Sequence, residues 1–443
     1  MLGCLSGFGR LRGGQPVERT YARSPPGLTV LHQREVEARA IGWPFVALYA
    51  AAYLSTGLVF IAPLLVTLAL KVDSLVPDDD APDRLALVVG VGALVSLFAN
   101  PFFGRMSDRT TSRFGRRRPW MVVGLLGGTL GVLTVALAGS IAVVLVGWCV
   151  AQLFFNALLA AQVAVLPDQV PPEWRGMVSG VLGTCLPIAS VAATFLVDLF
   201  NGHRLAMFMA PCAVGGFFIL AFAARLDDRP LLPARRPAWS MRELVGTFYF
   251  NPRRSPDFAW AFVSRFMFVL AYAFLVTYQA YFLIHGLGTP KGDVAHQIFL
   301  GTLAQGAVVV VISLLSGRLS DRTGRRKVFV ITASVAYGVA LLVIAAASDF
   351  DGYLLGMALS GVGFGMYFAV DLALVADVLP DERSTAKDLG VLNLASALPF
   401  SVAPAVAPVV LTVTAGSYPA LYVVAGGCAV LGATAIARIR GIR

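Results

Sequence analysis

Two ionisable side chains lie deep inside long apolar stretches of this sequence, where a charge needs a partner. Arg265 falls in an apolar run over about 258–285, and Asp371 falls in one over about 352–378. If both runs are helices, each side chain lies about 8 residues, or roughly 12 Å, from one end of its run. This equal depth predicts an ion pair, because an isolated charge is costly in a membrane. Protonation of Asp371 would break the pair, whereas a permanent pair would only brace this part of the chain, and the sequence leaves both open.

Arg265 also begins a row of polar side chains. Arg265, Tyr272 and Gln279 are spaced by seven residues and therefore share one face of a helix. That face could line a solute path, with an aromatic ring for stacking and an amide for hydrogen bonds. The alternative is a helix-packing seam held by polar side chains. The arginine favours the lined path.

Other apolar runs carry further candidates for solute binding. Gln152 and Asn156 lie one turn apart in the run over about 141–166, so they share a face. The remaining set of candidates for solute binding consists of two tyrosines and two amides. For these, packing between helices or a place at the membrane surface is an equal alternative to solute binding. That set is Tyr49, Tyr53, Gln305 and Asn393.

The elements that must position these residues are long and apolar. The chain is 57% hydrophobic and 14% charged, whereas soluble domains carry about 25% charged residues. A membrane-spanning helix needs about 20 mostly apolar residues. The sequence therefore predicts an all-α membrane protein with twelve transmembrane helices, over approximately 44–70, 84–104, 119–139, 141–166, 177–199, 205–224, 258–285, 294–316, 327–347, 352–378, 387–413 and 418–437.

The loop charges predict how these helices are oriented. Arginines and lysines concentrate near 105–118, 225–254 and 318–327, whereas the loops near 78–83 and 349–351 are acidic. Because lysine and arginine favour the cytoplasmic side, both termini are predicted to be cytoplasmic, in a multi-pass protein of the inner membrane. The predicted organisation is a disordered cytoplasmic tail over 1–42, a six-helix half over 43–224, a cytoplasmic linker over 225–257 and a second six-helix half over 258–443.

Two pairs of matching motifs relate the halves. Gly104-Arg-Met-Ser-Asp108-Arg-Thr is answered 213 residues later by Gly317-Arg-Leu-Ser-Asp321-Arg-Thr. Similarly, Asp168-Gln-Val-Pro-Pro-Glu is answered 209 residues later by Asp377-Val-Leu-Pro-Asp-Glu. Matches in the same order and at nearly the same spacing predict parallel repeats, with a solute site between the halves.

The first motif pair also predicts a gate. Gly104 would let two helices approach closely, and the carboxylate of Asp108 can pair with a neighbouring arginine. Such a pair holds one face shut and must break when that face opens. The alternative is that these charges only set the topology. The predicted gating residues are Gly104, Asp108, Arg109, Arg116, Arg117, Gly317, Asp321 and Arg322.

The loop after the second helix resembles the signature of a known family. Gly104-x-x-x-Asp108-Arg109 with Gly115-Arg-Arg is similar to the signature loop of the major facilitator superfamily. The longer string from Ser107 to Pro119 resembles its glycoside–pentoside–hexuronide and sucrose-transporter branch, as do the stretches 257–281 and 371–393. The resemblance covers about 44–437. It implies a symporter or facilitator for a sugar or glycoside, in which the two halves rock around a midplane cavity.

The resemblance also bears on proton coupling. Sucrose-type relatives tend to have a carboxylate near the position of Gln152, where this chain has an amide. That departure either moves coupling to Asp371 or argues for a facilitator. An efflux pump for a drug or secondary metabolite on the same fold is the alternative function, and broad apolar cavity walls would favour it.

Several classes of function lack their signatures here. No GxxxxGK[ST] loop, HExxH motif or metal-ligand cluster occurs, so neither an enzyme nor a cofactor or metal site is predicted. The net charge of +10 lies in short loops between apolar runs, which is typical of membrane topology and not of nucleic-acid binding. The expected partners are membrane lipid, a small-molecule substrate and, for coupled transport, protons. A monomer is expected.

Overall fold

The computed structural model describes residues 42–228, 230–231, 255–378, 391–392 and 394–439. The described residues from Pro44 onward form one compact unit. The predicted tail over 1–42 lies almost wholly outside the described residues, as does most of the predicted linker over 225–257.

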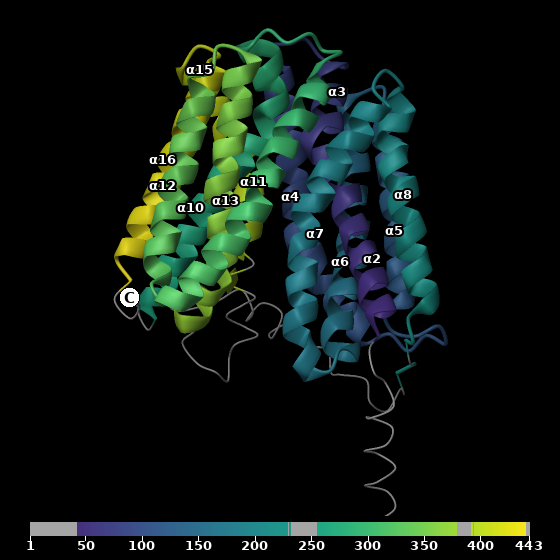
Figure 1. Cartoon of the computed structure of the whole chain (residues 1–443). Coiled ribbons are helices and arrows are strands. Elements are labelled where there is room, and N and C mark those ends of the chain that lie inside the picture. Colours follow the sequence, from purple (N-terminus) through teal and green to yellow (C-terminus); the bar gives the residue numbers. More distant parts are fainter. Residues whose placement is uncertain (1–41, 229, 232–254, 379–390, 393, 440–443) are drawn as a thin grey trace, which may run out of the picture. The chain divides into compact units, whose positions relative to one another are not determined.

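Twelve described helices are long and apolar enough to cross a membrane, which confirms the predicted all-α membrane fold. The first and seventh spans are each continued by a π-helical turn, so they carry more than one label (Figure 1). The first half contains α2 (Trp43–Ala62) with η1 (Pro63–Thr67) and α3 (Leu68–Asp73), then α4 (Ala81–Asp108), α5 (Arg118–Leu137), α6 (Ile141–Gln169), α7 (Pro172–Leu199) and α8 (Arg204–Arg225). The second half contains α10 (Pro256–Tyr281) with η3 (Phe282–Gly286), α11 (Val294–Thr323), α12 (Arg326–Ala345), α13 (Phe350–Val378), α15 (Pro399–Val413) and α16 (Tyr418–Ala437).

The two halves repeat the same helix pairings. In the first half α6 packs against α4 and α5, and α5 packs against α8. In the second half α13 packs against α11 and α12, and α12 packs against α16. Between the halves, α4 packs against α15 and α7 packs against α11. The internal repeat seen in the motifs is therefore a repeat of architecture.

Glycine allows close helix contact at α5, and not at the predicted position on α4. A Cβ at Gly131 would lie 2.7 Å from the carbonyl oxygen of Gly147 and 2.8 Å from Cα of Ala151, so only glycine fits between α5 and α6. A Cβ at Gly104 would meet only Ala160 Cβ, at 4.0 Å, and one at Gly317 would meet no described atom within 4 Å. In this conformation neither signature glycine is needed for close helix approach.

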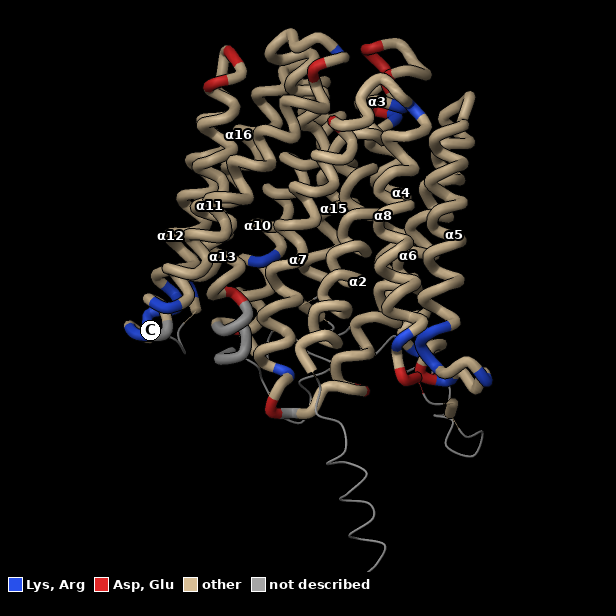
Figure 2. Tube along the Cα trace, turned by 45° about the vertical axis from the view of Figure 1, so that its right-hand side comes forward, with Lys and Arg blue, Asp and Glu red and all other residues tan. Residues whose placement is uncertain are grey.

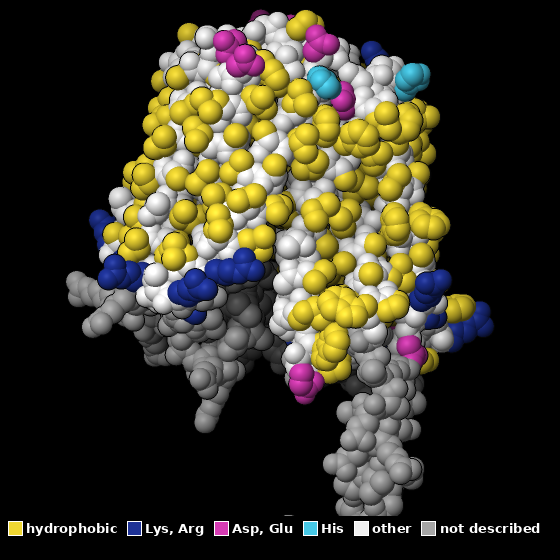
Figure 3. Space-filling view, in the orientation of Figure 1, with side chains coloured by type: hydrophobic (Ala, Val, Ile, Leu, Met, Phe, Trp, Pro, Cys, Tyr) yellow, Lys and Arg dark blue, Asp and Glu magenta, His cyan; other side chains and the backbone are white. Residues whose placement is uncertain are grey.

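Charged residues gather at the two ends of the helical bundle and are nearly absent from its middle (Figure 2). The basic end carries the arginines near 105–118 and 318–327, and the acidic end carries the aspartates near 73–83 and 349–351. Apolar side chains cover the band between them on the face shown in Figure 3. This distribution is what a bilayer demands, because hydrocarbon meets the middle of the helices and water meets their ends.

One π-helical turn occurs in the first span of each half, although the two turns do not align by the repeat offset. η1 continues the first span and η3 continues the seventh, and both lie toward the acidic end. Single π turns inside α-helices are rare and occur frequently at functional sites. η1 lies where the first helices of the two halves approach each other, since η1 and α3 both contact α10.

Candidate substrate and coupling site

The structure contains the predicted ion pair between α10 and α13. Arg265 Nη1 lies 2.7 Å from Asp371 Oδ2, and Arg265 Nε donates a hydrogen bond of 2.8 Å to Ser396 Oγ. The Arg265 and Asp371 side chains are 12% and 3% exposed. The serine, which the sequence analysis did not single out, ties the pair to the segment that precedes α15.

A neutral pair occupies the corresponding place in the first half. The repeat offset of 209 residues relates Arg265 to Thr56 and Asp371 to Gln162. Thr56 Oγ1 donates to Gln162 Oε1 at 2.7 Å, across the same separation of 106 residues as the charged pair. Both pairs join the first helix of a half to the fourth. The position therefore joins the same two helices in both halves, and only the second half adds charge.

Tyr272 and Gln305 line one small cavity between the halves. α7 supplies Ser190 from the first half, and α11 and α13 supply Thr302 and Phe364 from the second. The Tyr272 ring lies 4.8 Å from the Phe364 ring, and Gln305 Nε2 donates to Ser360 Oγ at 2.7 Å. The enclosed volume is about 20 Å³, so a sugar could enter only if the halves separated here. The structure thus brings together two of the predicted substrate-binding residues.

Gln152 and Asn156 form an amide cluster on α6 in the first half. Asn156 Nδ2 donates to the backbone oxygen of Gln152 at 2.8 Å and lies 3.4 Å from its Oε1. Asn100 Nδ2, from α4, lies 3.4 Å from Asn156 Oδ1. Asn156 is buried and Gln152 is partly exposed. Asn100 was not predicted, since a single amide in an apolar run gives no periodic signal.

The other predicted substrate-binding residues lie apart from this cavity. Tyr49 is fully buried, stacks on Phe222 and donates to the backbone oxygen of Gln162 at 2.7 Å, so in this conformation it packs helices. Tyr53 is partly exposed. Gln279 is buried between the halves, with Nε2 lying 3.4 Å from the Leu65 oxygen in η1. Asn393 lies outside the described residues.

Arg117 organises the predicted gate at the basic end. Its guanidinium lies 2.6 Å from Asp108 Oδ1 and 2.9 Å from Asp168 Oδ2, and Arg116 adds a contact of 2.8 Å to Asp168. Burial alone would lower the pKa of Arg117, but these hydrogen bonds and charges raise it, so the guanidinium stays charged. All four residues belong to the first half.

Asp228 completes this network from the segment after α8. Its Oδ2 accepts hydrogen bonds from the backbone N–H groups of Arg117 at 2.5 Å and Arg118 at 2.8 Å, at the start of α5. A carboxylate there satisfies helix N–H groups and the positive end of the helix dipole. Gly115 has φ of 102°, and a Cβ there would collide with the Asp228 carboxylate.

The remaining predicted gating residues lie near the ends of α4 and α11. Arg109 follows α4, and Gly317 and Arg322 lie near the end of α11. The side chain of Asp321 is outside the described part of the structure.

Contacts between the halves seal the acidic end. Lys291 Nζ lies 2.8 Å from Asp73 Oδ2 and 3.2 Å from Asp78 Oδ1, and the hydrogen bond with Asp73 raises the pKa of Lys291. The Tyr281 hydroxyl lies 3.3 Å from the carbonyl oxygens of Ala69 and Ala81. Where both partners are described, the hydrogen bonds and ion pairs between the halves all lie toward this end.

Two similar six-helix halves, joined at one end around a polar site, define a secondary transporter. The family model of the Major Facilitator Superfamily matches residues 45–309 and 292–441, and the chain belongs to that family. Its fold and family are those of transporters and not of enzymes.

Curated relatives match shorter regions. The multidrug resistance protein MdtL of Klebsiella pneumoniae (strain 342) is 29% identical over 136 residues, which are 30% of this chain and 34% of MdtL. The sucrose transport protein SUC4 of Arabidopsis thaliana is 40% identical over 57 residues, 13% of this chain and 10% of that protein. Human proton-associated sugar transporter A is 44% identical over 52 residues, 12% and 7% of the two chains. The matched region spans about a third of MdtL and less of the sugar transporters.

Solved structures share the fold over nearly the whole chain. A mutant of the nucleoside transporter NupG superposes with a TM-score of 0.70 at 14% identity, covering 89% of this chain and 99% of that one. The human organic anion transporter MFSD10 superposes with a TM-score of 0.62 at 18% identity, covering 88% and 98%. At such identities the likeness extends to the fold alone.

Proposed function

We propose that this protein carries a sugar or glycoside across the cell membrane by alternating access of its two halves. The cluster around Tyr272 and Gln305 carries the proposal, because it combines an aromatic platform with converging hydroxyl and amide groups. Ser190 supplies a hydroxyl from the opposite half. Sugars are bound by such a combination, since a ring face stacks on an aromatic side chain while hydroxyl groups exchange hydrogen bonds. The partial matches to sucrose and sugar transporters agree with this assignment.

The proposal includes an orientation and a conformational state. By the distribution of lysine and arginine, the basic end faces the cytoplasm of a bacterial cell, in the inner membrane. The end sealed by Lys291 and Tyr281 then faces outward, and the described conformation is the one closed to the outside. In the described conformation the Asp108 carboxylate is paired with Arg117. In the alternate state this carboxylate would take part in closing the cytoplasmic side.

Proton coupling would act through the second half. Asp371 occupies the position in the second half that corresponds to the neutral Gln162 in the first. Its partner Arg265 lies on the same helix as Tyr272. Protonation of Asp371 would free Arg265 to move relative to α13. Solute and proton would then move together in a symporter.

A drug or secondary-metabolite efflux pump is the second candidate function. The cavity walls also include Leu186, Pro187 and Val309, and a neighbouring apolar groove of about 460 Å³ lies between α7 and α11. Apolar walls suit amphipathic drugs. The match to MdtL is longer than those to the sugar transporters.

Transport into proteoliposomes separates the two candidates. The panel contains sucrose, maltose, melibiose and xylose, with tetraphenylphosphonium as an amphipathic cation, each with and without an imposed proton gradient. We expect uptake of at least one sugar, which Gln305→Leu lowers about tenfold or more because the half-buried amide and its hydrogen bonds are lost. Ser313→Ala is the matched control, since Ser313 lies about two turns further along α11 and bonds to its own helix at the Val310 oxygen. Movement of tetraphenylphosphonium without any sugar would reject the sugar assignment.

A further inference from the structure

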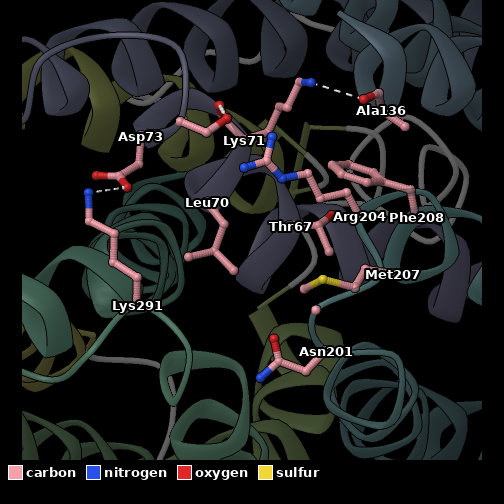
Figure 4. A pocket seen from close by; sticks show the side chains of 12 residues that line it. Thr67, Leu70, Lys71, Asp73, Ala136, Asn201, Arg204, Met207, Phe208 and Lys291 are labelled. Carbon is pink, nitrogen blue, oxygen red and sulfur yellow. Dashed lines mark hydrogen bonds and ion pairs between the residues drawn. The ribbon is translucent and has the colours of Figure 1, made fainter.

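A second cavity lies at the acidic end, away from the cluster around Tyr272. It has a volume of about 540 Å³, within the usual range of small-molecule pockets. The ends of α3 and α5, the loop before α8 and the first turn of α8 supply most of its walls, and Lys291 reaches it from the second half (Figure 4).

Positive charge exceeds negative charge in this cavity. Lys71, Arg204 and Lys291 line it together with a single carboxylate, Asp73. Lys291 is paired with that carboxylate, and Lys71 donates to the Ala136 carbonyl at 2.9 Å. Arg204 is exposed and forms no ion pair within the part of the chain that the structure describes. Its guanidinium extends among the lining residues (Figure 4).

Two buried polar atoms in the lining lack hydrogen-bond partners. Thr67 is 1% exposed and Asp73 is 7% exposed, yet neither Thr67 Oγ1 nor Asp73 Oδ1 has a hydrogen-bond partner among the described residues. In a regular helix the threonine hydroxyl commonly bonds to the carbonyl four residues earlier, but Thr67 ends the π turn η1. Buried polar groups are rarely left unpaired, so a ligand that hydrogen-bonds to them would remove a real cost.

The unpaired groups define the chemistry of a ligand. Arg204 suits a carboxylate, which a guanidinium can bind through two hydrogen bonds. The free oxygen of Asp73 needs a donor such as a hydroxyl group. Leu70, Met207 and Phe208 give the cavity an apolar wall.

We propose that this cavity is a binding site for a small hydroxy-carboxylic acid with an apolar group, distinct from the transport site. The carboxylate pairs with Arg204, the hydroxyl group donates to Asp73, and the apolar group packs on Phe208. The cavity is complete only while Lys291 lies against Asp73, so a bound anion favours the conformation closed at the acidic end.

Titration calorimetry on the full-length protein in phosphatidylcholine nanodiscs tests the proposal. Mandelate is the probe, because it carries a carboxylate, a hydroxyl group and a phenyl ring. We expect one mandelate to bind per protein. Phenylacetate and mandelamide should each bind with an affinity lower by about tenfold or more, since each lacks one charge-assisted contact. Arg204→Gln should weaken mandelate binding about tenfold or more. Arg225→Gln, at the opposite end of the same helix, should leave binding unchanged.

Several outcomes would overturn the proposal. These are no mandelate binding, equal binding of the three probes, or equal losses in the two arginine variants. The probe comparison uses the unaltered protein, so it does not depend on how well a variant folds. If phosphatidylglycerol stabilises the protein in an Arg204-dependent way while mandelate does not bind, the occupant is a lipid headgroup and the proposal is wrong. Binding is measured without transport, so this result is independent of the sugar assignment.

Discussion

Replacing Asp371 with asparagine should destabilise the protein strongly while keeping the shape of the side chain. Arg265 would keep Ser396 as a partner but would lose the carboxylate that neutralises its charge. With side chains only 12% and 3% exposed, little solvent screening applies. Breaking a buried pair by removing one partner costs about 3–5 kcal/mol, because the other charge stays buried. We therefore expect Asp371→Asn to lower the free energy of unfolding by about 3 kcal/mol or more.

Removing both charges should restore much of that loss. The first half shows that a neutral Thr56–Gln162 hydrogen bond can join the same two helices at 2.7 Å. The double variant Arg265→Gln with Asp371→Gln places two neutral amides at these positions and leaves no unpaired charge. Replacing a buried ion pair by neutral groups is often close to neutral for stability. We expect the double variant to recover at least half of the stability that the single variant loses.

Chemical unfolding in detergent micelles, followed by tryptophan fluorescence, measures both effects. A single variant within about 1 kcal/mol of the parent would show that the pair is not a buried brace. A double variant less stable than the single one would refute the inference drawn from the Thr56–Gln162 hydrogen bond in the first half of the protein. Proton-driven uptake by the double variant then separates bracing from coupling. Accumulation persists if the pair only braces, and is lost while solute exchange persists if Asp371 carries the proton.

Three further predictions concern the two ends of the protein. Lys291→Gln should increase labelling of cysteines placed at the acidic end, because the salt bridge between the halves is lost. In the parent protein Lys291 is fully protonated below the ordinary lysine pKa, and its salt bridge is lost only as pH rises through the raised pKa. Labelling of the parent should therefore not change between about pH 6 and 8. Gly115→Ala should lower stability by about 1–3 kcal/mol, since its positive φ and a clash both disfavour a side chain, whereas Gly139→Ala in open space should have little effect on thermal unfolding. Arg117→Lys should cost about 2 kcal/mol, because an ammonium cannot bridge two carboxylates as a guanidinium does, and equal losses in the exposed control Arg113→Lys would contradict this.

Hydropathy and repeats were enough to predict the fold. Apolar length requires spanning helices, and the matched motifs require two halves of one design, so the twelve spans followed directly. The helix ends were less accurate. α4 continues through Arg105 to Asp108, beyond the predicted end near 104, because hydropathy marks where lipid ends and not where the helix ends.

The site was predictable only where chemistry was unusual. Arg265 and Asp371 stood out because charges are rare in apolar runs, and the structure pairs them. Asp228 and Lys291 gave no such signal, since a charged residue in a polar loop has no periodicity and its partner is distant in sequence. Tyr49 is fully buried in this conformation, and its residue type could not decide its role, because a tyrosine in a membrane helix is as suited to packing as to binding a solute.

The paired π turns bear on how the acidic end can open. A π turn accommodates one extra residue, and moving that residue along the helix turns the residues it passes by about 100°. Such a shift in η3 would carry Tyr281 away from the carbonyl oxygens of Ala69 and Ala81 without unwinding the helix. Deleting Ile284 removes the extra residue, and unchanged accessibility at the acidic end would argue against the idea. With one such turn in each half, the first helix of each half would rotate about its own axis. This rotation would break the contacts between the halves at the acidic end before the halves separate.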